Sequence, residues 1–291
     1  MARQFKRVVR CTVGVGEVAL KFEELKISFS IESSRVGYPN IGNVELYNLS
    51  PQSRQQIKEE GTFFRIEAGY PDNEGIIFSG NLRNSWTVRR EADLVAILTG
   101  ADGDSDFQNA VINTTLDTGS TPVDVIETLG GSLVEGKLVL AEGIPETPSE
   151  KPIILSGNTK DELDKVCRNN NLEWNFLNGS LEVVSNDRLV EEFTLISKET
   201  GMVGVPVVTD IGVNVDTLLN PKIRPNRGIK VLSDFSDVQL SQLEFSKRDT
   251  DLGAGLFRVN KVIYKGDNRD GAFLCSIEGI RVSNGRVVGQ S

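Results

Sequence analysis

The sequence predicts a mainly β protein in which a small α+β insert separates two β-rich regions. Two observations support this prediction: a similar strand-and-turn pattern occurs near both ends, and the stretch between the two copies changes to helices. Each copy has a strand closing on a polar loop, a long strand, a charged turn and a second long strand. The copies lie at residues 64–100 and at residues 228–235 with 256–282. We therefore expect β-rich domains of related fold at residues 1–105 and 195–291, and the insert domain at residues 106–194.

Alternating apolar and polar residues predict the strands of the first region. Residues 25–31 place every apolar side chain on one face, the period of two that is typical of a half-buried strand. Further strands are expected at residues 5–13, 18–22 and 43–47. A short helix should follow, with Ser50 as its N-cap, Pro51 as its first residue and Gly61 as its stop.

The insert should contain helices followed by a hairpin. A strand is expected at residues 111–116, and a helix should open at Thr121 and Pro122. A second helix is predicted at residues 159–170, capped by Thr159, because acidic residues fill its first turn and Leu163, Val166 and Cys167 form an apolar stripe. Asn178 and Gly179 between alternating segments predict a type I′ hairpin turn. After residue 195 the chain returns to β structure, and residues 237–251 are expected to form an exposed loop.

Composition excludes several classes of protein. The chain has no histidine, so the Ser-His-Asp and Cys-His nucleophile pairs and most transition-metal sites are absent. Three isolated cysteines, without a CxxC pair, indicate buried reduced thiols at Cys11, Cys167 and Cys275. A formal charge of −9 opposes tight binding to nucleic acid phosphates. No apolar run approaches the roughly 18 residues needed to cross a bilayer, and no signal peptide is expected.

Two short motifs have a chemical and a structural interpretation. Residues 14–19 match G-x-G-x-x-A, but a dinucleotide site requires a helix to follow, and the next segment has strand spacing. A hairpin turn is therefore expected there. Asp102, Asp104 and Asp106 have the spacing of a calcium loop, but Phe107 and Asn113 stand where that loop needs Gly and Glu. A solvated acidic turn is expected instead.

Carboxylates and aromatic residues also have two interpretations each. Pairs for glycoside hydrolysis can be drawn from the insert, but any acidic chain supplies such pairs, and three of them are better placed as dipole partners of a helix. These carboxylates are Glu142, Glu146, Asp161, Glu162 and Asp164. Tyr47, Trp86 and Trp174 lie on expected strands, where core packing is the first interpretation and contact between subunits the second. No catalytic, cofactor-binding or metal-binding residue is assigned.

Three stretches together resemble the baseplate or tail hub proteins of contractile-tailed bacteriophages. The first, residues 43–82, contains NLS, a strand ending in Ala-Gly-Tyr, and IFSGNL. The second is the helix of the insert with LEWNFLNGSLEVV. The third, residues 197–231, contains TGMVGVP and LLNPKI, and the GD-x-x-x-G turn follows at residues 266–271. Two positions depart from the family pattern: Lys265 stands where a His is usual, and Asn226-Arg227 delays the expected Gly to Gly228.

This resemblance implies a structural virion protein located in the tail baseplate and assembled in the host cytoplasm. Each chain would supply two tube-like antiparallel β-barrel domains flanking the small α+β domain. Three chains would then make a pseudo-sixfold ring that joins the hexameric tail tube to the trimeric central spike, with tape measure and wedge proteins as further partners. DNA would pass through the lumen without sticking, and neither membrane insertion nor a cofactor is implied.

Three other functions remain open at the level of sequence. One is another tube-like tail component, such as a distal tail protein or a tube initiator. Another is a tail enzyme that cleaves the cell wall, which would need an acid pair converging in a cleft. The third is a carbohydrate-binding tail module, although aromatic residues make up only 7% of the chain and are spread along it.

Overall fold

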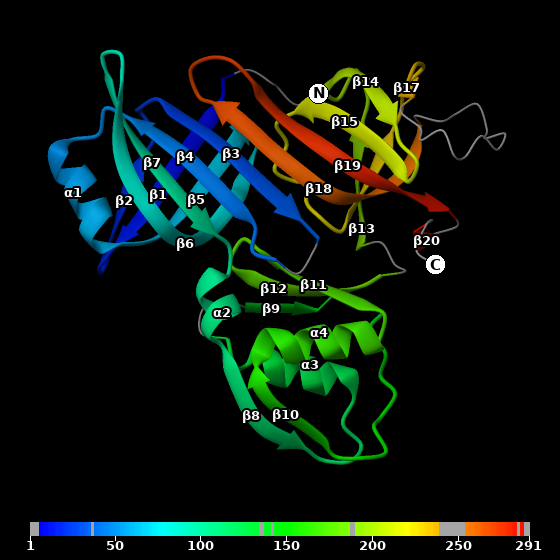
Figure 1. Cartoon of the computed structure of the whole chain (residues 1–291). Helices are drawn as coiled ribbons and strands as arrows, with labels where there is room; N and C mark the ends of the chain where they lie inside the picture. The colour runs from blue at the N-terminus through cyan, green and yellow to red at the C-terminus, as the bar shows by residue number, and fades with distance from the viewer. Residues whose placement is uncertain are drawn as a thin grey trace.

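The computed structural model confirms a mainly β chain with an α+β insert, shown in Figure 1 as a broad β body above a smaller α+β unit. It describes residues 6–35, 38–133, 137–140, 143–186, 190–238, 254–283 and 286–287. None of the helices within these residues is long and apolar enough to cross a membrane.

The N-terminal half of the β body contains seven strands and one helix. Their spatial order in the sheet is β3-β4-β7-β6-β5-β1-β2. The elements are β1 (Val8–Val15), β2 (Val18–Phe22), β3 (Ile27–Ser34), β4 (Ile41–Tyr47), α1 (Pro51–Glu60), β5 (Gly61–Tyr70), β6 (Asn73–Arg90) and β7 (Asp93–Ala101). Residues 14–19 form the β1–β2 hairpin, so the expected turn is confirmed.

The C-terminal half of the body is built around a second set of antiparallel strands. Its main order is β18-β19-β15-β14-β17, with β16 pairing β18 and β13, and β20 pairing β19. The elements are β13 (Val190–Ile196), β14 (Met202–Val208), β15 (Gly212–Leu218), β16 (Arg227–Val231), β17 (Asp237–Val238), β18 (Gly255–Asp267), β19 (Phe273–Ser283) and β20 (Arg286–Val287). Residues 237 and 238, expected in a loop, are therefore strand, and residues 239–251 of that expected loop lie outside the described residues.

The two halves repeat one strand order and share one sheet. Each half contains a pair of neighbouring hairpins whose spatial orders, β3-β4-β7-β6 and β14-β15-β19-β18, correspond strand by strand. The halves join where residues 28–34 of β3 pair antiparallel with residues 261–267 of β18, a junction called here the internal seam. The division into two tube-like domains stays a proposal, supported by this repeated order.

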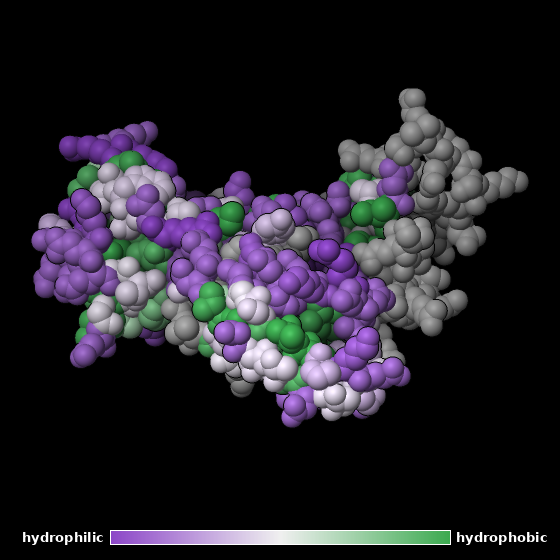
Figure 2. Space-filling view, turned by 60° about the horizontal axis from the view of Figure 1, so that its bottom comes forward, coloured by the Kyte–Doolittle hydropathy of each residue, from purple (hydrophilic) through white to green (hydrophobic). Residues whose placement is uncertain are grey.

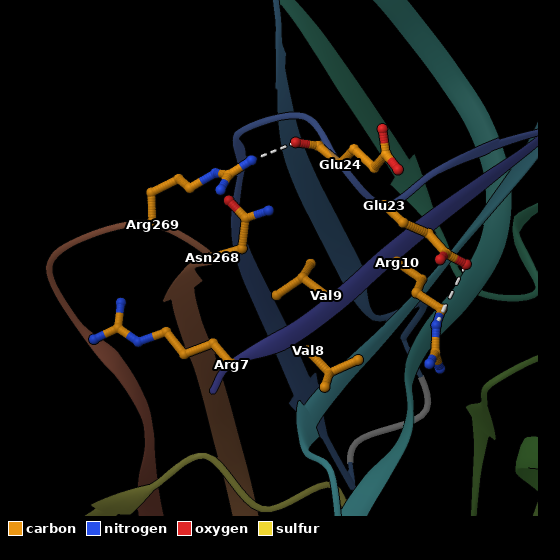
Figure 3. A pocket seen from close by; sticks show the side chains of 8 residues that line it. All are labelled: Arg7, Val8, Val9, Arg10, Glu23, Glu24, Asn268 and Arg269. Carbon is orange, nitrogen blue, oxygen red and sulfur yellow. Dashed lines mark hydrogen bonds and ion pairs between the residues drawn. The ribbon is translucent and has the colours of Figure 1, made fainter. Parts of the chain in front are cut away.

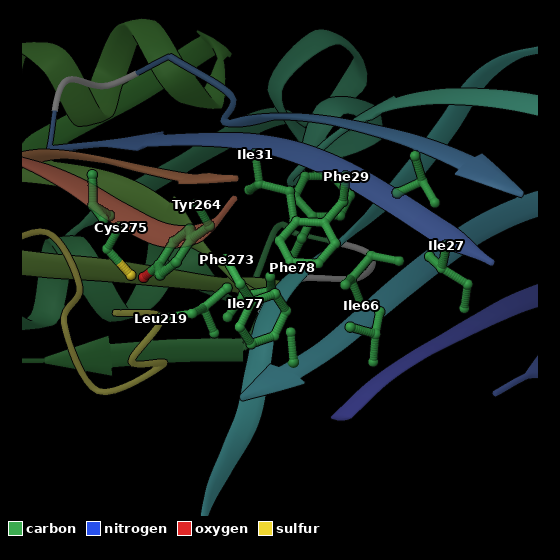
Figure 4. Packing of buried hydrophobic residues seen from close by; sticks show 14 of the residues in the cluster. Ile27, Phe29, Ile31, Ile66, Ile77, Phe78, Leu219, Tyr264, Phe273 and Cys275 are labelled. Carbon is green, nitrogen blue, oxygen red and sulfur yellow. The ribbon is translucent and has the colours of Figure 1, made fainter. Parts of the chain in front are cut away.

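One hydrophobic core runs beneath the internal seam. Phe29 of β3 packs edge-on against Phe273 of β19, with ring centroids 6.1 Å apart. Tyr70 of β5 meets the same ring at 5.5 Å. Figure 4 shows side chains of β3, β5 and β6 facing those of β18 and β19, so apolar burial holds the two halves together.

The insert has a core of its own. Its elements are α2 (Asp104–Asn109), β8 (Val111–Leu116), α3 (Pro122–Gly130), β9 (Lys137–Leu140), β10 (Ile153–Asn158), α4 (Thr159–Asn169), β11 (Leu172–Leu177) and β12 (Ser180–Ser185). Helices α3 and α4 pack between the β8–β10 pair and the β11–β12–β9 sheet. The outer face of β8–β10 carries Val111 and Ile154, which are 70% and 72% exposed, and Figure 2 shows this end turned towards the viewer.

Local signals explain most of these elements. Asn178 and Gly179 have φ of 55° and 82°, the two positive angles that a type I′ turn requires, so the predicted β11–β12 hairpin is confirmed. Helix α1 begins as expected, because the Ser50 side chain accepts from the Ser53 amide. The predicted cap of α4 is wrong by one residue: the Asn158 side chain accepts from the Lys160 amide, which makes Thr159 the first helical residue.

Candidate assembly surface

Eight strands of the body share one largely polar side, called here the polar face. The strands follow the order β14-β15-β19-β18-β3-β4-β7-β6, and alternate residues of each point to this side. Across the internal seam, Lys261 of β18 forms an ion pair with Glu32 of β3 at 2.7 Å. Thr99 of β7 donates to Asn43 of β4 at 2.9 Å. The opposite side of the same strands forms most of the core, so the polar face is the side of these strands that meets solvent.

Carboxylates outnumber lysines on the polar face. By strand register the acidic residues are Glu32, Glu45, Asp93, Asp216, Asp267 and Glu278, and the cations are Lys261, Lys265 and Arg90. Arg90 forms a bidentate pair with Glu45, at 2.7 and 2.8 Å, and thereby lowers the pKa of that carboxyl. The face is therefore mildly acidic with interspersed cations.

The eight strands of the polar face end in two open edges. Residues 73–81 of β6 pair with β5 on one side, whereas from Asn81 onward β6 pairs with β7 on the other. Residues 82–90 therefore have one side without a strand partner in the described part of the chain. At the far end, β14 pairs with β15, and β17 covers only Val207 and Val208 on its outer side. Residues 202–206 form the second open edge.

Both open edges expose apolar side chains. Trp86 of β6 is 42% exposed, and Val203 and Val205 of β14 are 42% and 45% exposed. Core packing, the first interpretation for Trp86, is therefore wrong, while Trp174 is buried against Phe176 as expected. An exposed edge strand with apolar residues is prone to pair with another strand unless it is protected. These two edges are the strongest candidates for contact with another chain.

A groove runs beside the open edge of β6. It lies between α1 and strands β6 and β7, has a volume of about 550 Å³, and is lined among others by Arg54, Ile57, Trp86 and Leu98. The helix carries its charged residues along this groove, and the buried Leu98 forms part of its floor. A strand added to the edge at residues 82–90 would lie against this groove.

A second pocket, of about 390 Å³, lies where the start of β1 meets the β18–β19 turn (Figure 3). Arg7 donates to the carbonyl oxygens of Asp267, Asp270 and Gly271, each at 2.8 Å. Arg269 donates to the carbonyl of Glu24. Since these cations are occupied by backbone oxygens, they clamp the turn in place rather than offer an anion site.

The acidic motif at residues 102–106 is the main correction to the sequence prediction. Asp104 begins α2, and its carboxylate pairs with Arg83 and lies 8% exposed. Asp102 is only 1% exposed and accepts from the backbone amides of Asn178 and Gly179 in the β11–β12 turn. The expected solvated turn is therefore wrong. Alternating aspartates gave no signal of burial, because the amides that Asp102 accepts from lie in a hairpin 76 and 77 residues later.

Two of the other carboxylate candidates have structural partners, whereas Glu146 and Asp161 are exposed. Glu162 pairs with Lys165 at 2.7 Å, and Asp164 accepts from the indole of Trp174 at 2.8 Å. Glu142 lies outside the described residues. All three cysteines are free and buried, and burial raises the pKa of Cys167 and Cys275 to about 12. In the described part of the chain, no group of three or more His, Cys, Asp or Glu residues could hold a metal ion.

No protein-family model matches the chain, and no curated protein sequence matches it. Solved structures do. The chain is similar to the 43 kDa tail protein of prophage MuSo2 from Shewanella oneidensis, with a TM-score of 0.61, 8% identity, and coverage of 97% of this chain and 98% of that one. It is similar to a tail protein from Neisseria meningitidis MC58, with a TM-score of 0.60, 9% identity, and coverage of 95% and 97%.

A third structure extends the likeness to secretion machinery. The E. coli c3393 protein is described as a type VI secretion component with structural similarity to the T4 bacteriophage tail proteins gp27 and gp5. It aligns with a TM-score of 0.59 and 9% identity, over 96% of this chain and 79% of that protein. At these identities the likeness concerns the fold, and it spans nearly the whole chain. The architecture of this chain is thus the one found in these bacteriophage tail proteins and in this type VI secretion component.

Proposed function

We propose that this chain is a structural component of a phage-type tail or baseplate, and that it acts as a trimeric hub ring. The observation that carries the proposal is the repeated strand order together with two unlike open edges. The fold shared with tail proteins supports the setting, and the geometry described below supports the ring.

The internal seam shows how one half of the chain joins the next. There, the C-terminal part of β18 pairs with β3. Strand β18 begins the second of the two corresponding hairpins in its half, and β3 begins the first of the two in its half. The corresponding strands that remain open are β6 and β14. Pairing residues 82–90 of β6 with residues 202–206 of β14 in the next chain repeats the seam between chains. Such head-to-tail contacts close into a ring when the rotation allows it.

The exposed side chains fit this pairing. Trp86 from one chain and Val203 and Val205 from the next would lie on the same face of the joined sheet. Aromatic and β-branched residues are favourable cross-strand neighbours, worth about 0.2–1 kcal/mol for each pair. The pairing also removes these two edges from solvent, which protects them from pairing with unrelated strands.

Three chains give six similar halves and three inserts. In Figure 1 the β6–β7 and β18–β19 turns stand together at the top of the β body, and the insert projects from the bottom. A trimer would thus present six similar hairpins at one rim and three inserts at the other. We infer that the hairpin rim meets a sixfold tail tube and the insert rim a threefold spike.

The polar face would line the channel. Its mixture of carboxylates, lysines, serines and threonines offers no continuous row of cations for phosphates to bind. The formal charge of −9 per chain also repels nucleic acid at longer range. We propose that DNA passes along this wall without being held, and that the protein has no enzymatic role.

Mass measurement and an image of the purified protein test the ring. The expected result is the mass of three chains and a closed ring with a central channel. A dimer without a channel, or a channel lined mainly by lysine and arginine, contradicts the proposal. A monomer at micromolar concentration that trimerises only when mixed with a tail-tube protein would support the pairing while showing that it needs a template.

A further inference from the structure

We propose that the β11–β12 hairpin of the insert is a clasp that spans the internal seam and fixes the angle between the two halves of the β body. This inference concerns a single chain and does not depend on the ring. It rests on the polar contacts of the hairpin, some of which are made with the N-terminal half of the β body and the others with the C-terminal half.

The N-terminal half binds the hairpin through groups at the ends of β3, β4 and β7. The Asn40 side chain donates to the Phe176 carbonyl at 2.6 Å, and Asn175 donates to the Ser34 carbonyl at 3.4 Å. At the tip, Asp102 accepts from the amide of Gly179 at 2.8 Å and from its neighbour in the turn. The whole turn is thus tied to the end of β7.

The C-terminal half binds the same hairpin from the other side. Arg227 of β16 pairs with Glu182 of β12 at 2.6 Å, and Glu182 is only 4% exposed. Arg258 of β18, fully buried, donates to the carbonyl of Asn186 at 2.8 Å. Each half therefore holds one hairpin strand or its continuation by directional contacts.

Arg35 connects all three parts. Its backbone amide donates to the Asn260 carbonyl at 3.0 Å, and its Nε donates to the Asn260 side chain at 2.8 Å. Its guanidinium also pairs with Glu173 of β11 at 2.9 Å. One residue at the end of β3 thus contacts both β18 across the seam and β11 of the insert.

These contacts are suited to setting geometry rather than to adding stability. The hydrophobic cores of the body and the insert are separate clusters with no residue in common. Burial raises the pKa of Glu173 and lowers that of Arg35, so loss of water costs both partners more than their attraction returns. Hydrogen bonds and ion pairs depend on direction. Because these contacts would break if the two halves of the β body rotated, together they select one angle between the halves.

The hairpin also distinguishes the two kinds of junction in this sheet. At the internal seam it covers the end of β3 and contacts the start of β18. At the open edge of β6 the insert makes contact through the Arg83–Asp104 pair of α2, but this contact reaches β6 alone and does not bridge two strands. The clasp would therefore hold the angle inside each chain, while the edges that meet other chains stay free to adjust.

Amide hydrogen exchange of the purified chain tests the clasp. The variant is Glu173→Gln with Glu182→Gln, which keeps side-chain size and removes both charges from the hairpin. We expect exchange at least tenfold faster in β11 and β12 and at the insert end of the seam, around Ser33, Ser34 and Lys261. Exchange in β8 and β10 should change least, because α3 and α4 separate that strand pair from the hairpin.

Glu162→Gln is the matched control. Glu162 is also buried, at 7% exposure, and ion-paired, but to Lys165 within α4. It should leave the seam unchanged. Faster exchange in the hairpin with a seam as protected as in the parent overturns the proposal, since the hairpin would then only rest on the body.

A milder variant covers the case in which the double variant does not fold. Arg35→Lys keeps the charge that faces Glu173 but loses the Nε donation to Asn260. It should speed exchange at the end of β3 and in β18 near Asn260 with a smaller effect in β11. Equal exchange in variant and parent at the seam contradicts the clasp.

Discussion

The carboxylate of Asp102, at the end of β7, accepts from the backbone amide of Gly179 at 2.8 Å, and so joins the β body to the turn of the insert. Burial raises the pKa of Asp102 to about 7, although the amides of Gly179 and Asn178 and the Asn40 side chain favour the ionised form. Because the ionised carboxylate is buried away from water, the group changes its protonation state near neutral pH, and this contact is therefore sensitive to pH in that range.

The first prediction concerns this pH dependence. Because the folded pKa lies above the unfolded value, the folded state holds more protons, and Asp102 favours folding at acid pH. That contribution is lost as pH rises from about 4 through 7. Asp102→Asn removes it, so the free energy of unfolding of the parent relative to the variant should fall by up to about 4 kcal/mol between pH 4 and 8.

Urea denaturation of both proteins at several pH values measures the difference. The comparison with the variant is needed because other carboxyls act the other way; Arg83, for example, lowers the pKa of Asp104. A gap between parent and variant that stays constant from pH 4 to 8 contradicts the prediction.

The second prediction concerns the open edge of β14. Val205→Lys places a strongly hydrated cation on the edge that we expect to pair with another chain. The trimer should dissociate at least tenfold more readily, with unchanged circular dichroism. Val111→Lys is the control, because Val111 is also exposed but lies on the insert. Light scattering over a dilution series distinguishes the two, and equal loss of trimer in both variants would refute the assigned edge.

The third prediction concerns the channel wall. Asp216→Lys with Glu278→Lys replaces two neighbouring carboxylates of the polar face by cations. The assembled protein should then retain nucleic acid during purification, and should release it as salt rises because phosphate contacts weaken with ionic strength. The ratio of absorbance at 260 and 280 nm reports this. Unaltered ratios in a protein that still forms rings would mean that these residues do not face the channel.

The fourth prediction concerns a close approach between β15 and β19. A Cβ on Gly212 would lie 1.8 Å from the Gly279 carbonyl oxygen, so the strands leave no room for a side chain. Gly212→Ala should cost about 3 kcal/mol or more of stability. Gly131→Ala, at a helix end with φ of −67° and no atom closer than 3.4 Å, should instead stabilise by about 0.5 kcal/mol. Urea midpoints measure both, and similar midpoints would contradict the prediction.

The fifth prediction is that the protein lacks hydrolase activity and bound transition metal. The chain has no histidine, and its cysteines are isolated. Elemental analysis should find far less than one zinc per chain, and zymography on peptidoglycan should show no clearing. About one zinc per chain, or a cleared zone that the purified protein alone produces, would refute it.

Periodicity predicted the strands of this fold but not their neighbours. Residues 25–31 alternate in a way that shows which face of β3 is buried, yet nothing local indicates that Ser28 bonds to Asp267. The Asn178-Gly179 hairpin was predictable because its turn depends on two adjacent residues. The burial of Asp102 was not, because it depends on where that hairpin docks. Similarly, Trp86 is a large apolar residue of the kind usually buried in a core. It lies at an edge only because β6 changes its partner strand along its length.

The internal seam has a consequence for synthesis of the chain. Ser28 and Asp267, which share a hydrogen bond, lie 239 residues apart. During translation at about 5–20 residues per second, β3 therefore waits many seconds for its partner strand. For that time its edge is exposed on the ribosome, along with the apolar side chains that later meet β19. The insert, whose core uses only its own residues, can fold while the body waits. Native packing of the first strands is thus a late event. Chaperones should therefore matter most while only the N-terminal half has been synthesised.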